Sequence, residues 1–167
     1  ILGPQTENYQ PSVGNVFQGD VGWTEEEKKL AWTYGEVRWL FAADLNNDGW
    51  LDLIVPSHAL SCATVYWGGP EGFSPERSHK FNVPGTINCT VADLNKNGYP
   101  DLIFSHHCIN SKTAMYESYL TIYWGSAEGY KESRKTMLPT HCANAVTAGD
   151  FNGNGWLDLY ATCYNNG

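Results

Sequence analysis

Basic residues are scarce in this sequence, and so is any long apolar run. Lys and Arg together number 10 against 18 Asp and Glu, which gives a formal net charge of −8. The only mild basic clusters lie at 28–29 and 131–135, where a solvated surface explains them. Since nucleic-acid surfaces need a basic patch, we expect no nucleic-acid partner. No stretch approaches the length of a membrane span, so we expect none.

The motifs of common enzymes are also missing. The sequence has no Ser-His-Asp order, no nucleophile elbow and no Gly-rich phosphate loop. Paired carboxylates occur only in a repeated loop, where metal binding accounts for them. We therefore expect that the protein is not an enzyme. The chain begins at Ile1 and shows no signal peptide, which we interpret as a processed or excerpted piece.

One nine-residue pattern occurs three times, starting at Asp44, Asp93 and Asp150. Oxygen-bearing side chains occupy positions 1, 3, 5 and 9, and Gly occupies position 6. Ca²⁺ takes about six to eight oxygen ligands, and Gly permits the sharp turn that aims the position-7 carbonyl at the same centre. Simple turn formation would explain the Asp, Asn and Gly residues but not the repeated Asp at position 9.

The pattern therefore predicts up to three bound Ca²⁺ ions. The predicted ligands are Asp44, Asn46, Asp48, Trp50 and Asp52 in the first loop, Asp93, Asn95, Asn97, Tyr99 and Asp101 in the second, and Asp150, Asn152, Asn154, Trp156 and Asp158 in the third. These are not EF-hands, because position 12 is Val55, Phe104 or Ala161 in place of Glu. Strand-like segments flank each loop, so we expect each loop to join the two strands of a hairpin.

A second block recurs at Val65–Phe73 and Ile122–Tyr130, with a degenerate copy at Val16–Trp23. The intervals between its copies equal those between the loops. We therefore predict an N-terminal arm at 1–15 and three tandem units at about 16–58, 65–107 and 122–167, each with the block first and the loop second. Units of about four short strands at a period near 50 residues indicate an all-β fold of propeller-type blades.

These motifs resemble the FG-GAP/VCBS-type repeat, the blade of integrin-alpha-like β-propellers. The resemblance covers about 16–167 and includes the Tyr-Trp-Gly block, the loop followed by Leu, and the segment Leu138–Val146. It implies a four-stranded blade per unit and a Ca²⁺ ion in each loop. Gln18 departs from the usual Trp of the block, and Asn97 and Asn154 replace an Asp. Fewer carboxylates should weaken Ca²⁺ binding in the second and third loops.

Three blades are too few for a closed propeller, which usually has about four to eight. The chain is therefore expected to be part of a longer propeller or an open stack that a neighbour closes. One hypothesis is that the arm, or the first block, docks by strand addition beside the last blade of another copy. The alternative is that the arm is a flexible terminus.

Five cysteines indicate an oxidising compartment, although five reduced thiols are the alternative. One disulfide scheme pairs Cys89 with Cys108 and Cys142 with Cys163. The other pairs Cys62 with Cys89 and Cys108 with Cys142. The sequence does not choose between them. A zinc site is a further alternative, because histidines lie near three of these cysteines: His58, His106, His107 and His141.

Asn88 begins an Asn-Cys-Thr sequon, which predicts a glycan if it lies on a loop between blades. Trp50, Tyr99 and Trp156 occupy equivalent loop positions, where packing against the next blade is favoured over an exposed row that could stack on sugars. Together these features predict a secreted or cell-surface, calcium-binding structural or adhesion module. It would bind a protein partner or copies of itself through edge strands or blade contacts. The alternative is a lectin-like propeller that binds glycans.

Overall fold

The computed structural model describes residues 39–58, 62–107 and 117–163. Its strands form three antiparallel sheets. The first sheet contains β1 (Phe41–Ala43), β2 (Asp52–Ser57), β3 (Cys62–Tyr66) and β4 (Ser78–Asn82). The second contains β5 (Thr86–Ala92), β6 (Asp101–His106), β7 (Glu117–Tyr123) and β8 (Lys135–His141). The third contains β9 (Ala143–Gly149) and β10 (Asp158–Cys163), and a short 3-10 turn, η1 (Pro75–Arg77), precedes β4.

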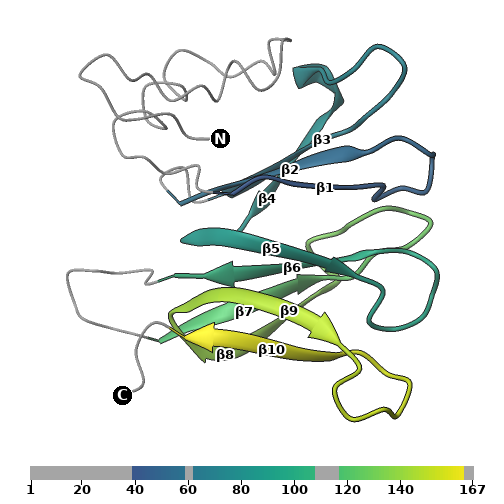
Figure 1. Cartoon of the computed structure of the whole chain (residues 1–167). Helices are drawn as coiled ribbons and strands as arrows, with labels where there is room; N and C mark the ends of the chain where they lie inside the picture. The colour runs from purple at the N-terminus through teal and green to yellow at the C-terminus, as the bar shows by residue number, and fades with distance from the viewer. Residues whose placement is uncertain (1–38, 59–61, 108–116, 164–167) are drawn as a thin grey trace, which may run out of the picture.

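The three sheets are stacked in chain order, with the second in the middle (Figure 1). One apolar cluster joins the first and second sheets and includes Ile54, Phe81, Leu102 and Phe104. Another cluster joins the second and third sheets around Ile103 and Val146. Successive residues of a strand face opposite sides of its sheet. Leu102 and Phe104 therefore face the first sheet, while Ile103 between them faces the third.

The strand content follows from the apolar runs after each loop. All six residues of β2 and all six of β6 are buried, as expected for central strands covered on both faces. The predicted hairpins are present: each nine-residue loop joins β1 to β2, β5 to β6 or β9 to β10. The prediction of an all-β protein is confirmed over the described residues. They form stacked sheets, and their assignment as blades of a partial or open propeller stays a prediction.

The predicted order of elements within a sheet is wrong. Each four-stranded sheet was expected to start with the Tyr-Trp-Gly strand and to end with the loop hairpin. In the structure the hairpin comes first, because β2 pairs with β3 and β6 pairs with β7, the strands that follow them. Sequence periodicity gives the length of a repeat but not its starting point. The predicted arm at 1–15 and the block Val16–Trp23 lie outside the described residues.

The disulfide schemes are also corrected. Cys89 and Cys163 carry free thiols, which rules out the predicted pairs Cys89–Cys108, Cys142–Cys163 and Cys62–Cys89. Cys89 is buried in the cluster between the first and second sheets, and burial raises the pKa of its thiol. Cys163 is exposed whereas Cys142 is buried. Cys108 lies outside the described residues, so the Cys108–Cys142 pair stays a prediction.

Asn88 lies within strand β5, and its expected position on a connecting loop is wrong. Its side-chain oxygen is buried and has no hydrogen-bond partner among the described residues. A glycan would attach to the amide nitrogen and not to this oxygen, so glycosylation of Asn88 stays a prediction. No helix in the described part of the chain is long and apolar enough to span a bilayer.

Candidate functional site

The three nine-residue loops share one backbone conformation. Position 4 has a left-handed φ in each loop, with values of 60° at Asn47, 59° at Lys96 and 73° at Gly153. Position 6 is also left-handed, with φ between 85° and 87° at Gly49, Gly98 and Gly155. Glycine adopts this conformation without steric cost, and asparagine tolerates it better than most residues. The loops therefore curl twice in the same sense within nine residues.

The curl brings side-chain oxygens together over the backbone of the first loop. The Asp48 N–H donates to Asp44 Oδ1 and to Asn46 Oδ1, both at 3.1 Å. The Gly49 N–H donates to Asp44 Oδ2 at 2.9 Å, and the Trp50 N–H donates to Asp48 Oδ1 at 2.8 Å. Since two oxygens contact a single N–H group, the side chains at positions 1 and 3 must lie next to each other.

The second and third loops repeat these contacts almost without change. The position-5 N–H donates to the position-1 and position-3 oxygens at 3.1 Å in the second loop and at 3.0 Å in the third. The position-6 N–H donates to the second oxygen of position 1 at 2.8 Å in both. Three loops with a different residue at position 4, and with either Trp or Tyr at position 7, thus give one arrangement of oxygens.

Asp at position 9 holds the loop to the next part of the sheet. Asp52 is fully buried and accepts hydrogen bonds from the N–H of Leu45 and the N–H of Gly68, both at 2.8 Å. Asp101 is equally buried and accepts from Leu94 at 2.9 Å and Gly125 at 2.8 Å. We call this pair of contacts the position-9 clamp. It joins the start of the first and the second loop to the Gly of the Tyr-Trp-Gly strand that follows.

The surroundings of the clamp carboxylates Asp52 and Asp101 disfavour their charged form. Burial raises the pKa of the Asp52 carboxyl, and the two backbone N–H groups that it accepts oppose the shift. The negative charges of Asp48 and Asp44 raise it further. Burial likewise raises the pKa of Asp101, with Asp93 adding to the effect. A cation bound beside these groups would relieve the repulsion between the carboxylates of a loop.

The glycines of the Tyr-Trp-Gly strands permit a close approach to the loops. A Cβ added at Gly68 would lie 2.2 Å from the carbonyl oxygen of Leu51. A Cβ added at Gly125 would lie 2.1 Å from that of Pro100. Each glycine therefore packs its backbone directly on position 8 of the loop while its N–H reaches position 9. The repeated Tyr-Trp-Gly motif and the repeated loop therefore contact each other directly in both four-stranded sheets.

Neighbouring loops also touch one another at the same end of the stack (Figure 1). The Asn47 side chain of the first loop donates to the Gly98 carbonyl of the second at 2.9 Å. The Lys96 ammonium of the second loop lies 4.1 Å from the ring centre of Trp156 in the third. In both cases position 4 of one loop reaches position 6 or 7 of the next. The loops thus form a continuous array that links the sheets.

The equivalent aromatic residues of this array are not packed away as predicted. Trp50 is 47% exposed and Trp156 is 52% exposed, so the favoured packing against the next sheet is wrong for both. Tyr99 is partly buried. These rings form a partly exposed aromatic surface beside the oxygen-rich loops.

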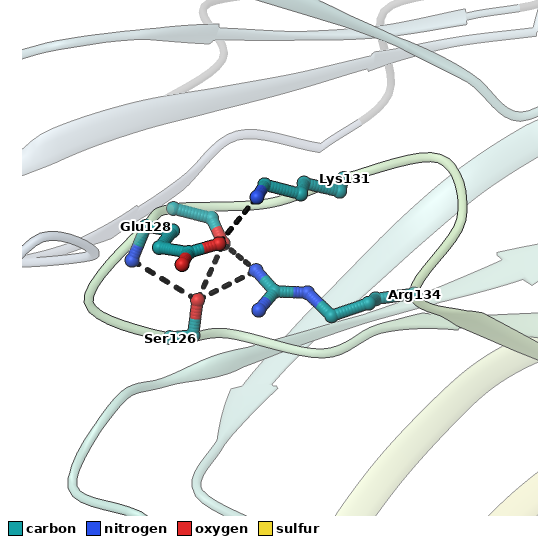
Figure 2. Close-up of polar contacts among 5 residues, drawn as sticks. Ser126, Glu128, Lys131 and Arg134 are labelled. Carbon is teal, nitrogen blue, oxygen red and sulfur yellow. Dashed lines mark hydrogen bonds and ion pairs between the residues drawn. The ribbon is translucent and has the colours of Figure 1, made fainter.

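Two arginines that sequence reasoning missed support the adjoining turns. Arg134 donates to the Ser126 hydroxyl at 2.6 Å and to the Gly129 carbonyl at 2.5 Å, and Lys131 pairs with Glu128 in the same turn (Figure 2). Arg77 makes the equivalent contact with the Gly72 carbonyl in the first sheet. The expected solvated role of Arg134 is therefore wrong. Each arginine lies five positions after the glycine whose carbonyl it contacts, and this shared spacing is the sequence signal that could have identified the role.

One of the four histidines proposed for a zinc site, His106, has another role. His106 is buried, and its Nδ1 lies 2.5 Å from the Pro84 carbonyl, which can only accept. Nδ1 therefore carries the proton, and Nε2 accepts from the Thr121 hydroxyl at 2.8 Å. Burial lowers the pKa of this imidazole, which favours the neutral form. Both ring nitrogens are engaged, so His106 is a satisfied core residue.

The ligand sets of the loops can be compared with what a cation requires. In the described part of the chain, no three His, Cys, Asp or Glu side chains form a metal-ligand group. The loops instead mix carboxylate and amide oxygens at positions 1, 3 and 5, a set that suits a hard cation such as Ca²⁺. The position-9 carboxylate has lone pairs beyond those used in the clamp, so clamping and metal ligation are compatible.

Fold and loops together define the class: an all-β repeat protein whose stacked antiparallel sheets are joined by Asp- and Asn-rich hairpin loops. Residues 44–104 match the family model described as FG-GAP-like repeat. The match runs from the first loop to the strand after the second, so the chain carries an FG-GAP-like repeat there and the predicted resemblance is confirmed. Comparison with curated proteins gives no match.

Proposed function

We propose that this protein is a calcium-binding interaction module of the extracellular space, which binds a protein partner or further copies of itself. The FG-GAP-like repeat supports the interaction role. The observation that carries the calcium proposal is the repeated convergence of position-1 and position-3 oxygens on one N–H group, at 3.0–3.1 Å in all three loops. Such a preformed set of oxygens needs little rearrangement to take up a cation.

In this proposal the ion would be held by Asp44, Asn46 and Asp48 in the first loop, with Asp52 closing the site. The second and third loops would use their equivalents. Bound Ca²⁺ would neutralise the clustered carboxylates and stiffen the loop array. The protein residues do the positioning: the left-handed turns at positions 4 and 6 present the oxygens, and the position-9 clamp fixes the loop to its sheet.

Calorimetric titration of the chelator-treated full chain with Ca²⁺ tests the first part. We expect saturable binding of up to three ions, with the first loop the strongest because it has one more carboxylate. Asp44→Ala should remove one site, while Glu71→Ala, an exposed acidic residue outside the loops, should remove none. Equal titrations for Asp44→Ala and the unchanged protein would refute the proposed site.

The interaction role is tested by the mass of the native particle in calcium and in chelator. We expect a complex, either with itself or with a captured extracellular protein, that dissociates when calcium is removed. A particle that remains a monomer under both conditions would remove self-association from the proposal.

A lectin-like role is the second candidate, and the exposure of Trp50 and Trp156 favours it. Exposed indole faces beside oxygen-rich loops are suited to stacking on sugar rings. A glycan array with the unchanged protein and with Trp50→Ala tests this role. Binding that depends on Trp50 would support it, and an array without hits would remove it.

A further inference from the structure

The glycine at the end of each Tyr-Trp-Gly strand is buried, and the two four-stranded sheets supply its carbonyl with different donors. In the first sheet the Gly68 carbonyl accepts from Arg77 Nη1 at 3.3 Å. In the second sheet the Gly125 carbonyl accepts from Asn97 Nδ2 at 2.9 Å. Since both glycines are buried, a carbonyl left without a donor would be costly. An arginine and an asparagine therefore supply the same hydrogen bond in equivalent places.

The residue after this glycine explains the exchange of donors. It is Gly69 in the first sheet, where an added Cβ would lie 2.3 Å from Arg77 Nη1. It is Ser126 in the second sheet, and its hydroxyl accepts from Arg134 Nη2 at 2.6 Å (Figure 2). A side chain at this position thus fills the space through which the arginine reaches the carbonyl, and the serine binds the arginine instead. The Gly125 carbonyl is left to position 5 of the loop.

Position 5 can donate to the carbonyl only if it carries an amide. Asn97 Oδ1 accepts from the Tyr99 N–H at 2.8 Å while Nδ2 donates to Gly125, so two contacts fix the orientation of the amide. Asp48 stands at this position of the first loop and accepts from the Asn46 amide at 2.8 Å. Because an ionised carboxylate has no proton to donate, a carboxylate in place of Asn97 would turn an oxygen toward the glycine carbonyl oxygen.

We infer that Asn97 attaches the second loop to the Gly125 backbone without a cation, and that it sets the cation affinity of this loop by placing a neutral amide where the first loop has a carboxylate. The first loop needs no such attachment, because Arg77 serves the Gly68 carbonyl and Asp48 can contribute its charge. The first loop is therefore the more responsive to a cation. The affinity part rests on the proposed calcium function, whereas the attachment does not.

Asn97→Asp in the full chain tests both parts. Urea unfolding in chelator should show that the equilibrium constant for folding falls about tenfold, as expected when a buried carbonyl loses its donor. Calorimetric titration with Ca²⁺ should show that the second loop binds about tenfold more tightly, because a further carboxylate joins it. Unchanged stability in chelator would overturn the attachment. A loss of stability without any calcium binding would support the attachment and would refute the calcium function, and with it the affinity part.

Asp48→Asn is the matched control in the first loop. Its amide would meet a Gly68 carbonyl that Arg77 already serves, so the equilibrium constant for folding in chelator should change less than about twofold. Calcium binding by the first loop should weaken about tenfold, because the loop loses a carboxylate. A loss of stability in chelator equal to that of Asn97→Asp would overturn the proposal, since the contact with Gly125 would then not be its cause.

Ser126→Gly tests the exchange of donors. It restores the pair of glycines found in the first sheet and frees Arg134 to reach the Gly125 carbonyl. Asn97→Asp should therefore lower the equilibrium constant for folding by at most about threefold in the Ser126→Gly background, in place of about tenfold alone. Urea unfolding of the two single variants and the double variant in chelator completes the cycle. Equal losses in both backgrounds would overturn the proposed exchange.

Discussion

At the scale of single residues, Asp at position 9 combines an ionisable carboxyl group with full burial, two properties that rarely occur together. It is fully buried at Asp52 and Asp101, and burial raises the pKa of both carboxyls. Burial is tolerated because each carboxylate accepts from two backbone N–H groups that would otherwise be left without a partner at the junction of loop and sheet. This structural role is present whether or not a cation is bound.

Asp52→Ala should therefore lower stability even in chelator. Leaving two N–H groups unsatisfied should reduce the free energy of unfolding by about 2–4 kcal/mol. Asn46→Ala in the same loop removes only exposed contacts and should cost less than about 1 kcal/mol. Urea unfolding of both variants in chelator makes the comparison. Equal losses would mean that position 9 acts only as a metal ligand.

His106 gives a prediction about pH. Burial lowers the pKa of its imidazole in the folded state, so the unfolded chain binds a proton first as the pH falls. The stabilising contribution of neutral His106 is complete above the ordinary value of 6.5 and is lost as the pH falls from there toward the folded-state pKa. The loss should approach about 1.4 kcal/mol per pH unit within that window.

His106→Gln keeps a side chain that can hydrogen-bond but removes the titration. The pH dependence of its free energy of unfolding below pH 6.5 should be shallower than that of the unchanged protein. Urea denaturation at a series of pH values measures both slopes. Equal slopes for the two proteins would mean that groups other than His106 cause the loss of stability at low pH.

The sequence predicted the loops well because their contacts are local. The hydrogen bonds that shape the first loop join residues two to five positions apart, so the order of Asp, Asn and Gly was sufficient. The second half of the clamp could not be predicted in this way. Its donors, Gly68 and Gly125, lie 16 and 24 positions from the carboxylates they contact. Their approach depends on which strands pair.

At the scale of elements, the pairing of β2 with β3 explains why the starting point of each sheet was predicted wrongly. A tandem repeat can be divided at any point, and the periodicity of apolar residues is the same for every division. What decides the division is the close contact of the Tyr-Trp-Gly strand with the preceding loop, where the glycine backbone meets position 8 and position 9. Each glycine therefore shows that its strand belongs to the same sheet as the loop that precedes it in the chain.

Gly125→Ala tests that contact. The added Cβ would lie 2.1 Å from the Pro100 carbonyl oxygen, so the strand must shift and the hydrogen bond to Asp101 must lengthen. We expect a loss of about 1–3 kcal/mol in the free energy of unfolding, the range found for overpacking. Glu128→Ala, which changes an exposed residue in the turn after the same strand, should leave the free energy of unfolding close to that of the unchanged protein. Thermal and urea unfolding of both variants measure the difference.

At the scale of the whole molecule, the described sheets form a series of layers, with an apolar cluster between each pair of neighbouring sheets. The second sheet is covered on both faces, by the cluster around Phe104 on one side and the cluster around Ile103 on the other. The third sheet shares only one of these clusters. Stability in such an arrangement is the sum of the layers and the contacts between neighbours, so it should be lowest at an uncovered layer.

Native-state hydrogen exchange can measure this gradient. Amides of β6, which is buried throughout and paired on both edges, should exchange only through global unfolding. Amides of β10 should exchange at least about a hundredfold faster through local opening, because among the described residues that strand pairs only with β9 and none of its residues is buried. Uniform protection across all three sheets would mean that the stack opens as one cooperative unit and that β10 is already covered in solution.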